Sequence, residues 1–187
     1  MPGNGQDEVQ ALRRIIEITG LLNSTLNLDE LLQLIMNSAA DLLNAETSSL
    51  LLHDEDAGDL IIHVATGESG EQVAQQRVPA GKGIAGWVLE NDKPAVVDDP
   101  KSDPRFFAGM DETTGFETRN ILALPLKVRD RSVGVVEVIN KRDGSFTETD
   151  QQLAGALANQ AAIAIDNAQL YAKLADAVVT SRMSYRL

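Results

Sequence analysis

Two stretches near the start of the chain carry apolar residues at helical spacing. Within residues 7–22 the apolar positions recur every three or four residues, which is the period of an amphipathic helix. The same period returns in residues 28–44, and Asn27 directly before them is a candidate N-cap. The sequence therefore predicts two consecutive amphipathic helices, separated by the polar residues 23–25.

Short runs rich in β-branched residues and leucine follow the second helix. The polar, glycine-containing segment 54–59 separates the first two runs and is typical of a hairpin. The last two runs are the richest in Val, Ile and Leu, and the four residues 129–132 between them suit a turn, so we expect this pair in the centre of a sheet. In chain order the runs are 48–53, 60–66, 72–78 (a weaker pattern), 95–97 (an edge strand), 121–128 and 133–140.

Residues 98–118 follow neither the helical nor the strand period. Turn-forming Asp, Pro and Gly residues are interleaved there with Phe106, Phe107, Met110 and Phe116. Long irregular segments inside a compact domain are usually binding loops or disordered, and bulky apolar anchors argue against disorder. We predict that this segment folds as a cap over the sheet, preceded by a short helix at residues 84–89.

The last helical pattern, from Glu148 toward Val179, is long for a single domain. Thr147 is a candidate N-cap, with Asp150 at the third helical position. A helix longer than the ~20 Å of an average strand extends beyond the sheet, so apolar residues near its end point to a dimer. The alternative is one wide stripe buried within the monomer. The expected dimer seam consists of Leu153, Leu157, Ala164, Tyr171, Leu174 and Val178.

Composition narrows the classes of function. Sixteen Lys and Arg against 28 Asp and Glu give a formal net charge of −12, which repels nucleic-acid backbones and anionic lipid surfaces. The absence of cysteine excludes disulfides, thiolate nucleophiles and cysteine metal sites in this chain. We expect a cytoplasmic protein that binds neither nucleic acid nor membranes, holds no metal or covalent cofactor, and catalyses no reaction, since no catalytic set of residues is evident.

Several ordered motifs resemble the GAF domain family. They are Gly81-Lys82-Gly83-Ile84-Ala85-Gly86-Trp87-Val88, Asp103-Pro104-Arg105-Phe106, Thr114-Gly115-Phe116-Glu117-Thr118-Arg119-Asn120-Ile121-Leu122, Gly134-Val135-Val136-Glu137-Val138-Ile139-Asn140-Lys141 and Phe146-Thr147-Glu148-Thr149-Asp150. The resemblance covers about residues 26–172, which leaves residues 1–25 as an N-terminal amphipathic helix and residues 173–187 as an extension of the last helix. It implies an α+β fold of the GAF (PAS-like) type. Its sheet of about six antiparallel strands would carry the terminal helices on one face and a ligand cap on the other.

The resemblance is greatest to the GAF domains that regulate cyclic nucleotide phosphodiesterases and some bacterial adenylate cyclases. Those domains carry an Asn-Lys, Phe, Asp-Glu signature, which is matched here by Asn140, Lys141, Phe146 and Asp150, whereas Gln151 replaces the Glu. The resemblance implies a structural ion pair between Lys141 and Asp150 that ties the last strand to the terminal helix.

The resemblance also implies a ligand pocket between cap and sheet. Where relatives that bind cyclic GMP place an aromatic residue and Asp, this chain has Ala65 and Thr66, and a Thr hydroxyl, which both donates and accepts, suits adenine better. We therefore expect a regulatory sensor of a small molecule, with cyclic AMP favoured over cyclic GMP and a homodimer formed by the terminal helices. The implied contacts are Ser49, Ala65, Thr66, Ile84, Ala85, Phe107, Asp111, Thr114, Thr118 and Glu137.

Each of these assignments has an alternative. Thr114 and Thr118 can satisfy local backbone groups instead of a ligand, and the glycines at 81, 83 and 86 can serve close packing instead of a phosphate. Glu137 interrupts an apolar strand, so its carboxyl is either paired or functional. The competing function is a ligand-independent dimerisation or interaction domain, or a sensor of another small molecule. A collapsed cap with Phe107 filling the space would favour interaction, and a cavity of ~300 Å³ or more would favour sensing.

Overall fold

The computed structural model describes residues 10, 14 and 27–184. The helix expected in residues 7–22 lies almost entirely outside this part of the chain. The first complete element is helix α2, Leu28–Leu42, which begins where the sequence indicates: the side chain of Asn27 accepts a hydrogen bond from the Glu30 nitrogen at 2.9 Å. Its apolar face, which includes Leu32 and Ile35, is fully buried.

Six antiparallel strands form one sheet in the order β3-β2-β1-β6-β5-β4. The α+β class is as expected, but of the two apolar strands only β6 is central, because β5 lies next to the edge strand β4. The strands are β1 Ala45–His53, β2 Leu60–Ala65, β3 Arg77–Val78, β4 Ala95–Val97, β5 Ile121–Val128 and β6 Arg131–Lys141. The third strand is shorter than the pattern in 72–78 suggested, because residues Gly70–Val73 form the short helix α3 and only Arg77 and Val78 pair with β2.

The hairpin between β5 and β6 is tighter than the sequence suggested. Arg129 and Asp130 both have positive φ angles, 51° and 63°, as in a type I′ turn, so the loop needs only these two residues. This turn extends the ladder to the pair Val128 and Arg131. Further along β6, Gly134 lies so close to the Leu51 carbonyl of β1 that a Cβ atom there would collide with it.

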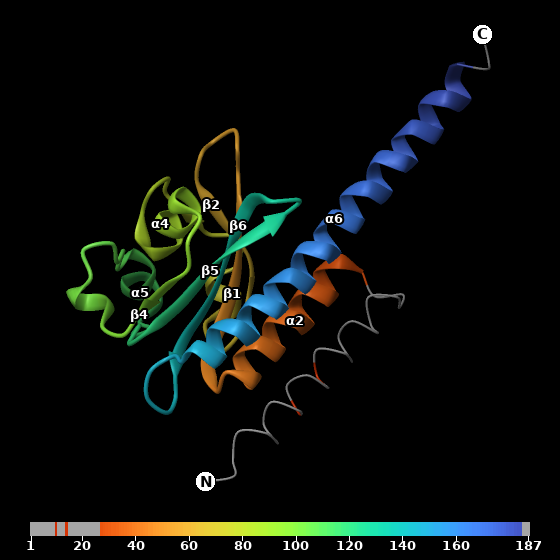
Figure 1. The fold of residues 1–187 in the computed structure, drawn as a ribbon. Helices are drawn as coiled ribbons and strands as arrows, with labels where there is room; N and C mark the ends of the chain where they lie inside the picture. Colours follow the sequence, from red (N-terminus) through yellow and green to blue (C-terminus); the bar gives the residue numbers. More distant parts are fainter. Residues whose placement is uncertain (1–9, 11–13, 15–26, 185–187) are drawn as a thin grey trace.

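Two helices cover one face of the sheet. Helix α6, Glu148–Ser184, packs on β5 and lies beside α2, and its C-terminal part extends beyond the sheet (Figure 1). The N-cap of α6 is reciprocal: the Asp150 nitrogen donates to the Thr147 hydroxyl at 3.1 Å, and the Thr147 nitrogen donates to the Asp150 carboxylate at 2.8 Å. No helix in the described part of the chain is both long and apolar enough to cross a membrane.

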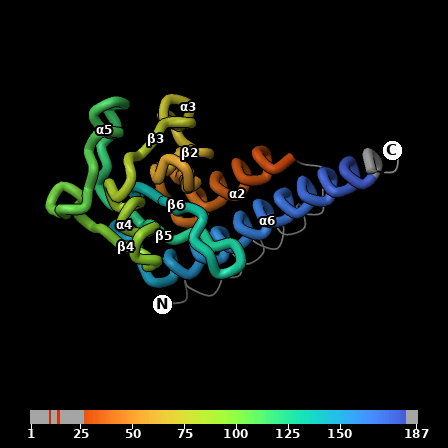
Figure 2. The backbone as a smooth tube through the Cα atoms, turned by 90° about the horizontal axis from the view of Figure 1, so that it is seen from above, coloured from red at the N-terminus to blue at the C-terminus, as the bar shows by residue number. Residues whose placement is uncertain are grey.

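The cap lies on the opposite face (Figure 2). It consists of helix α4, Gly83–Asn91, the 3₁₀ turn Pro100–Ser102 and helix α5, Gly109–Thr114. Ile84 and Val88 of α4 pack against the sheet in a second core that is separate from the core beneath α2 and α6. Residues 98–118 are therefore folded as a cap, as predicted. Trp87 packs at the edge of this second core, and the Arg105 guanidinium lies 4.5 Å from the centre of its ring.

The expected dimer seam is only partly available to a partner. Leu157 and Ala164 are 1% and 5% exposed and belong to the core of the monomer, and Leu153 packs against that core. Their assignment to a dimer seam was wrong, because the helical stripe that they share turns toward α2 and the sheet. Tyr171, Leu174 and Val178 lie on the extended part of α6 and are exposed.

Candidate functional site

A cavity of about 550 Å³ separates the cap from the sheet. Its floor includes a row of cross-strand neighbours in which Ala65 pairs with Ser49 and Ser49 with Glu137. Directly opposed residues in antiparallel strands share a face, and two of these three side chains are small, so the row leaves space beneath the cap. Each of the ten contacts expected from the sequence lines this cavity.

Glu137 places a carboxyl group in the middle of the floor. Its neighbours Val136 and Val138 pack on the helix side of the sheet, so Glu137 faces the cap, where it is half-buried. Among the described residues, no group donates a hydrogen bond to this carboxyl. Burial away from bulk water raises the pKa of Glu137 to about 7, because desolvation disfavours the charged form. Near neutral pH the cavity therefore contains a carboxyl group that can be either neutral or ionised.

Asp111 and Thr118 bind one another at the cavity wall. The Thr118 nitrogen and hydroxyl donate to the two Asp111 oxygens at 2.8 Å and 2.7 Å, which joins α5 to the segment that enters β5. Thr114 is satisfied locally, since its hydroxyl donates to the Met110 carbonyl at 2.9 Å and accepts from the Phe116 nitrogen at 3.2 Å. Thr114 therefore satisfies backbone groups close to it in the chain, which was the alternative to ligand contact. Thr118 instead contacts the Asp111 side chain of the cap.

Thr66 does not present its hydroxyl to the cavity. The hydroxyl accepts a hydrogen bond from the Ser48 nitrogen at 2.9 Å and lies 3.2 Å from the Ser48 hydroxyl, which itself donates to the Met36 carbonyl of α2. These contacts turn the Thr66 side chain toward the helix side of the sheet. The geometry therefore gives no support to its expected role in reading a base, because its hydroxyl makes a hydrogen bond to β1 that sequence reasoning did not anticipate.

The start of α4 forms another part of the wall. Gly86 makes the first helical bond, to the Lys82 carbonyl at 3.1 Å, so the Ile84 and Ala85 amides precede the hydrogen-bonded turns. Such amides, with the positive end of the helix dipole, favour an anion. Gly86 itself serves packing, because a Cβ atom there would lie 2.8 Å from the backbone of Gly81.

Several ionisable groups line the cavity. Among the described residues that line the cavity, Arg142 is the one cation, and Glu46, Glu68, Asp111 and Glu137 are the carboxyl groups. Glu46 is held by the Arg119 guanidinium and by the Asn140 side chain amide. Glu46 and Arg142 are functional candidates that sequence reasoning missed. Glu46 lies at the start of β1, and Arg142 directly follows the end of β6. In the sequence, the one feature that could have indicated these two residues is a charge next to the end of a predicted strand.

Phe107 does not close the cavity. It is 40% exposed, and its ring lies over Gly109, where a Cβ atom would be 2.7 Å from the ring. Phe107 also borders a smaller cavity of about 260 Å³ next to Trp87 and Arg105. The Phe107 ring thus forms part of the wall between two hollows and leaves the larger one empty.

Beyond the cavity, the expected joint between β6 and α6 is present. Lys141 Nζ lies 2.6 Å from the Asp150 carboxylate, and their side chains are 15% and 8% exposed. The ammonium also donates to the Leu43 carbonyl at 3.3 Å and lies 6.0 Å from the centre of the Phe146 ring. The ion pair is therefore inside the protein and joins β6, α6 and the end of α2.

Proteins of known sequence and structure resemble this chain over most of its length. The probable 3',5'-cyclic phosphodiesterase pde-5 of Caenorhabditis elegans is 30% identical over 176 residues, which is 89% of this chain and 24% of the worm protein. The dual 3',5'-cyclic-AMP and -GMP phosphodiesterase 11 of Drosophila melanogaster is 39% identical over 111 residues, 58% of this chain and 8% of the fly protein. The chain thus spans less than a quarter of either relative.

Solved structures share the fold. The GAF domain of a phosphoenolpyruvate-protein phosphotransferase from Coxiella burnetii superposes with a TM-score of 0.79 at 23% identity, over 91% of this chain and 99% of that one. The free methionine-R-sulfoxide reductase of Neisseria meningitidis superposes with a TM-score of 0.74 at 18% identity, over 91% and 96%. The family model for the GAF domain matches residues 25–166, which include the sheet, the cap and the cavity, and the chain therefore belongs to the GAF domain family.

Proposed function

We propose that this domain is a non-catalytic regulatory sensor that binds a cyclic nucleotide, preferably cyclic AMP, in the cavity between cap and sheet. The observation that carries the proposal is the empty space above the unpartnered Glu137 carboxyl. At about 550 Å³ the cavity lies within the ~300–1,000 Å³ range of small-molecule sites. The exposed position of Phe107 points the same way, since a collapsed cap would have buried this ring.

The cavity offers complementary chemistry at its two ends. The Ile84 and Ala85 amides at the start of α4 suit the cyclic phosphate, and Arg142 in the cavity wall supplies a cation. Glu137 on the floor suits the base. A neutral carboxyl donates to one atom and accepts from another, which matches adenine N1 and N6-H, whereas an ionised carboxylate accepts from guanine N1-H and N2-H. Since the Thr66 hydroxyl is engaged, the preference for adenine now depends on the protonation of Glu137.

The relatives support the ligand class without choosing the base. The worm relative is described as a probable cyclic phosphodiesterase, and the fly relative as acting on both cyclic AMP and cyclic GMP.

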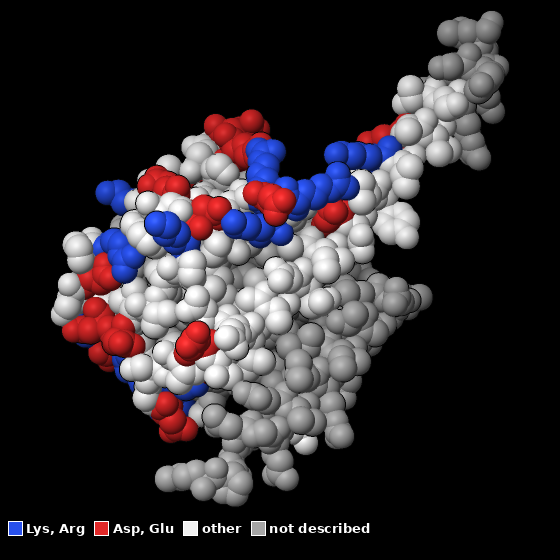
Figure 3. All heavy atoms as spheres, viewed as in Figure 1, with Lys and Arg blue, Asp and Glu red and all other residues white. Residues whose placement is uncertain are grey.

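The surface charge is compatible with a small ligand. Near the β5–β6 hairpin, Lys127, Arg129 and Arg131 pair with acidic side chains, and both signs of charge are interspersed on the face in Figure 3. A cytoplasmic location remains part of the proposal.

Isothermal titration calorimetry tests the proposal directly. Protein shown to be free of co-purified nucleotide is titrated with cyclic AMP and cyclic GMP at pH 6, 7 and 8. We expect cyclic AMP affinity to fall and cyclic GMP affinity to rise with pH in the wild type, and both trends to disappear in Glu137→Gln. The absence of heat at submillimolar nucleotide at every pH contradicts the nucleotide assignment. Binding without pH dependence contradicts the role of Glu137 in reading the base.

Dimerisation through α6 is the second candidate function, and it is independent of any ligand. Tyr171, Leu174 and Val178 are 75%, 63% and 51% exposed, and they recur at intervals of three and four residues on a helix with no sheet beneath it. Exposed apolar residues in this arrangement favour a second helix as partner. A dimer that forms equally with and without nucleotide, in a protein that gives no heat of binding, would make interaction the function of this domain.

A further inference from the structure

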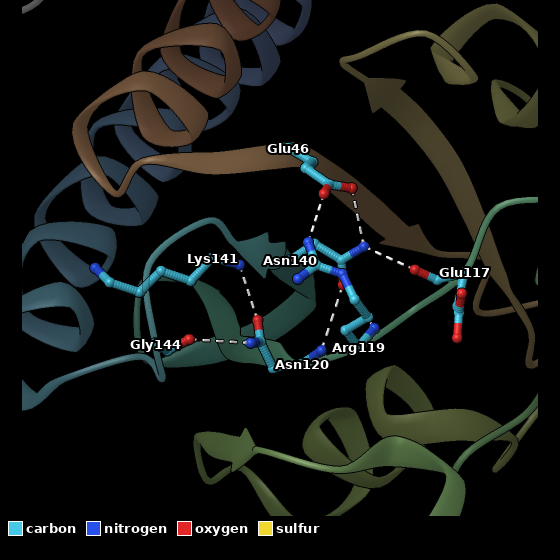
Figure 4. Close-up of polar contacts among 7 residues, drawn as sticks. All are labelled: Glu46, Glu117, Arg119, Asn120, Asn140, Lys141 and Gly144. Atoms are coloured by element: carbon cyan, nitrogen blue, oxygen red, sulfur yellow. Dashed lines mark hydrogen bonds and ion pairs between the residues drawn. The ribbon is translucent and has the colours of Figure 1, made fainter.

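Two buried asparagines face one another where β5 begins and β6 ends (Figure 4). Asn120 is 8% exposed and Asn140 is 1% exposed, and the Asn140 nitrogen donates to the Asn120 carbonyl at 3.0 Å. Buried amide side chains are costly unless their hydrogen bonds are satisfied. All four side-chain amide atoms of this asparagine pair (Asn120 and Asn140) have partners.

Asn140 connects β6 to the cavity wall. Its Oδ1 accepts from the nitrogens of Arg119 and Asn120 at 2.6 Å and 3.3 Å, and its Nδ2 donates to the Glu117 carbonyl at 2.7 Å. Nδ2 also donates to the Glu46 carboxylate at 3.0 Å. Asn140 has a φ of 62°, a left-handed conformation that asparagine tolerates better than most residues. One side chain thus contacts both the end of the cap and the start of β1.

Asn120 connects β5 to the base of α6. Its Oδ1 accepts from the Lys141 nitrogen at 2.8 Å, and its Nδ2 donates to the Gly144 carbonyl at 3.3 Å. Lys141 is the residue whose ammonium binds Asp150 in the first turn of α6. The asparagine pair is therefore reciprocal. The Asn140 side chain binds backbone groups of residues 117–120, and the Asn120 side chain binds backbone groups of Lys141 and Gly144.

One end of this hydrogen-bond network lies at the cavity, and the other lies at the connection between β6 and α6. Glu46 and Thr118 line the cavity, and Thr118 directly precedes Arg119, whose nitrogen binds Asn140 and whose guanidinium binds Glu46. Lys141 is the last residue of β6, and Gly144 lies in the connection between β6 and α6. Hydrogen bonds thus link Glu46 and the cap segment to Asn140, and link Asn120 to Lys141 and to the connection before α6.

We propose that Asn120 and Asn140 are a positioning pair that couples occupancy of the cavity to the base of α6. The inference rests on the proposed function in one respect, namely that the cavity takes a ligand. The route is a bonded series from Glu46 through Asn140 and Asn120 to the connection that carries Lys141. It meets the Lys141–Asp150 ion pair at Lys141; the ion pair itself fixes the helix and does not reach the cavity.

Hydrogen exchange without ligand tests the coupling independently of the ligand's identity. The informative amides are those of Lys141, Thr147 and Asp150, because each donates to a side chain in the network or the helix cap. Glu46→Gln in the cavity wall should speed their exchange several-fold to roughly tenfold, the effect of weakening about one hydrogen bond. Asn140→Gly, which tolerates the same φ, should have a similar effect, and adding Glu46→Gln to it should have no more.

Two comparisons separate coupling from general loss of stability. Lys101→Gln is the matched control, since it breaks an exposed ion pair with Glu117 in the same segment and leaves the asparagine pair intact. It should leave exchange at the base of α6 unchanged. Asn120→Ala, which removes both side-chain bonds to Lys141 and Gly144, should resemble Asn140→Gly. Unchanged exchange in Glu46→Gln, or full additivity with Asn140→Gly, overturns the proposal.

Cyclic AMP serves as the probe in the second experiment. In the wild type it should slow exchange at the base of α6, and in Asn140→Gly this protection should be lost while calorimetry still detects binding. If Asn140→Gly binds cyclic AMP and still protects α6, the coupling is wrong and the proposed function stands. If cyclic AMP does not bind the wild type, the proposed function fails and the ligand-free exchange alone decides the coupling.

Discussion

The Asp111 carboxylate accepts two hydrogen bonds from Thr118, and this pair fixes the cap helix α5 to the start of β5. Asp111→Ala removes both bonds and leaves the Thr118 nitrogen without its acceptor. We expect a loss of about 1–2 kcal/mol in local stability and faster hydrogen exchange in residues 109–118. Glu112→Ala, an exposed acidic change on the same helix, is the control. Equal exchange in the two variants would contradict the role of the pair.

The pH dependence of stability should reveal Glu137. Its pKa is raised from 4.5 to about 7 in the folded protein, so between these values the folded state holds a proton that the unfolded state has released. The free energy of unfolding therefore falls as the pH rises from 5 to 8, by about 2–3 kcal/mol at most. Urea unfolding of the wild type and Glu137→Gln across this range measures the difference. Parallel curves for the two proteins would show that the folded carboxyl is ionised throughout.

Removing one partner of the ion pair between Lys141 and Asp150 should strongly destabilise the fold. Asp150→Ala leaves a mostly buried ammonium without its anion and removes the cap of α6, so we expect a loss of about 3–5 kcal/mol. Asp143→Ala is a matched control in the same turn, where the carboxylate accepts one exposed hydrogen bond from Asn44, and it should cost about 1 kcal/mol or less. Similar midpoints in chemical unfolding would indicate that the ion pair contributes little.

Substitution of Thr66 should affect stability and not the choice of base. Thr66→Val removes the acceptor for the Ser48 nitrogen inside the sheet and should cost about 1–3 kcal/mol. Thr66→Asp should destabilise as well, because it places a charge between β1 and α2. Thermal unfolding measures the first effect, and calorimetry with both nucleotides measures the second. A switch from cyclic AMP to cyclic GMP in Thr66→Asp would show that this residue reads the base after all.

The extended part of α6 should control association without affecting the fold. Leu174→Glu combined with Val178→Glu changes two exposed side chains, so thermal stability of the monomer should change by no more than about 0.5 kcal/mol, while sedimentation velocity should show loss of the dimer. Val96→Glu, an exposed apolar position on the edge strand β4, should leave association unchanged. A wild type that is monomeric at all concentrations would exclude this dimer.

Local chemistry determined much of the fold from the sequence. Asn27 and Thr147 begin helices where they were expected to, since an N-cap depends on a side chain and amides within three residues of it. Glu137 was singled out because it interrupts the apolar run of β6, and the family motifs indicated the pair of Lys141 and Asp150. These features are short-range, or are recorded in a motif, and require no knowledge of how distant segments pack.

Only the tertiary structure shows which polar groups already have hydrogen-bond partners and which apolar side chains are buried. Thr66 is engaged because Ser48, 18 residues earlier, lies beside it in the sheet, and Leu157 is core because α2 packs against that side of α6. The link from Glu46 to Asn140 joins residues 94 positions apart. Periodicity assigns a residue to a face but does not say what covers that face or which hydrogen bonds are already made. Only the packing of strands and helices left Glu137 unpartnered beneath an open cavity, since Ala65, Ser49 and Glu137 come from three separate strands.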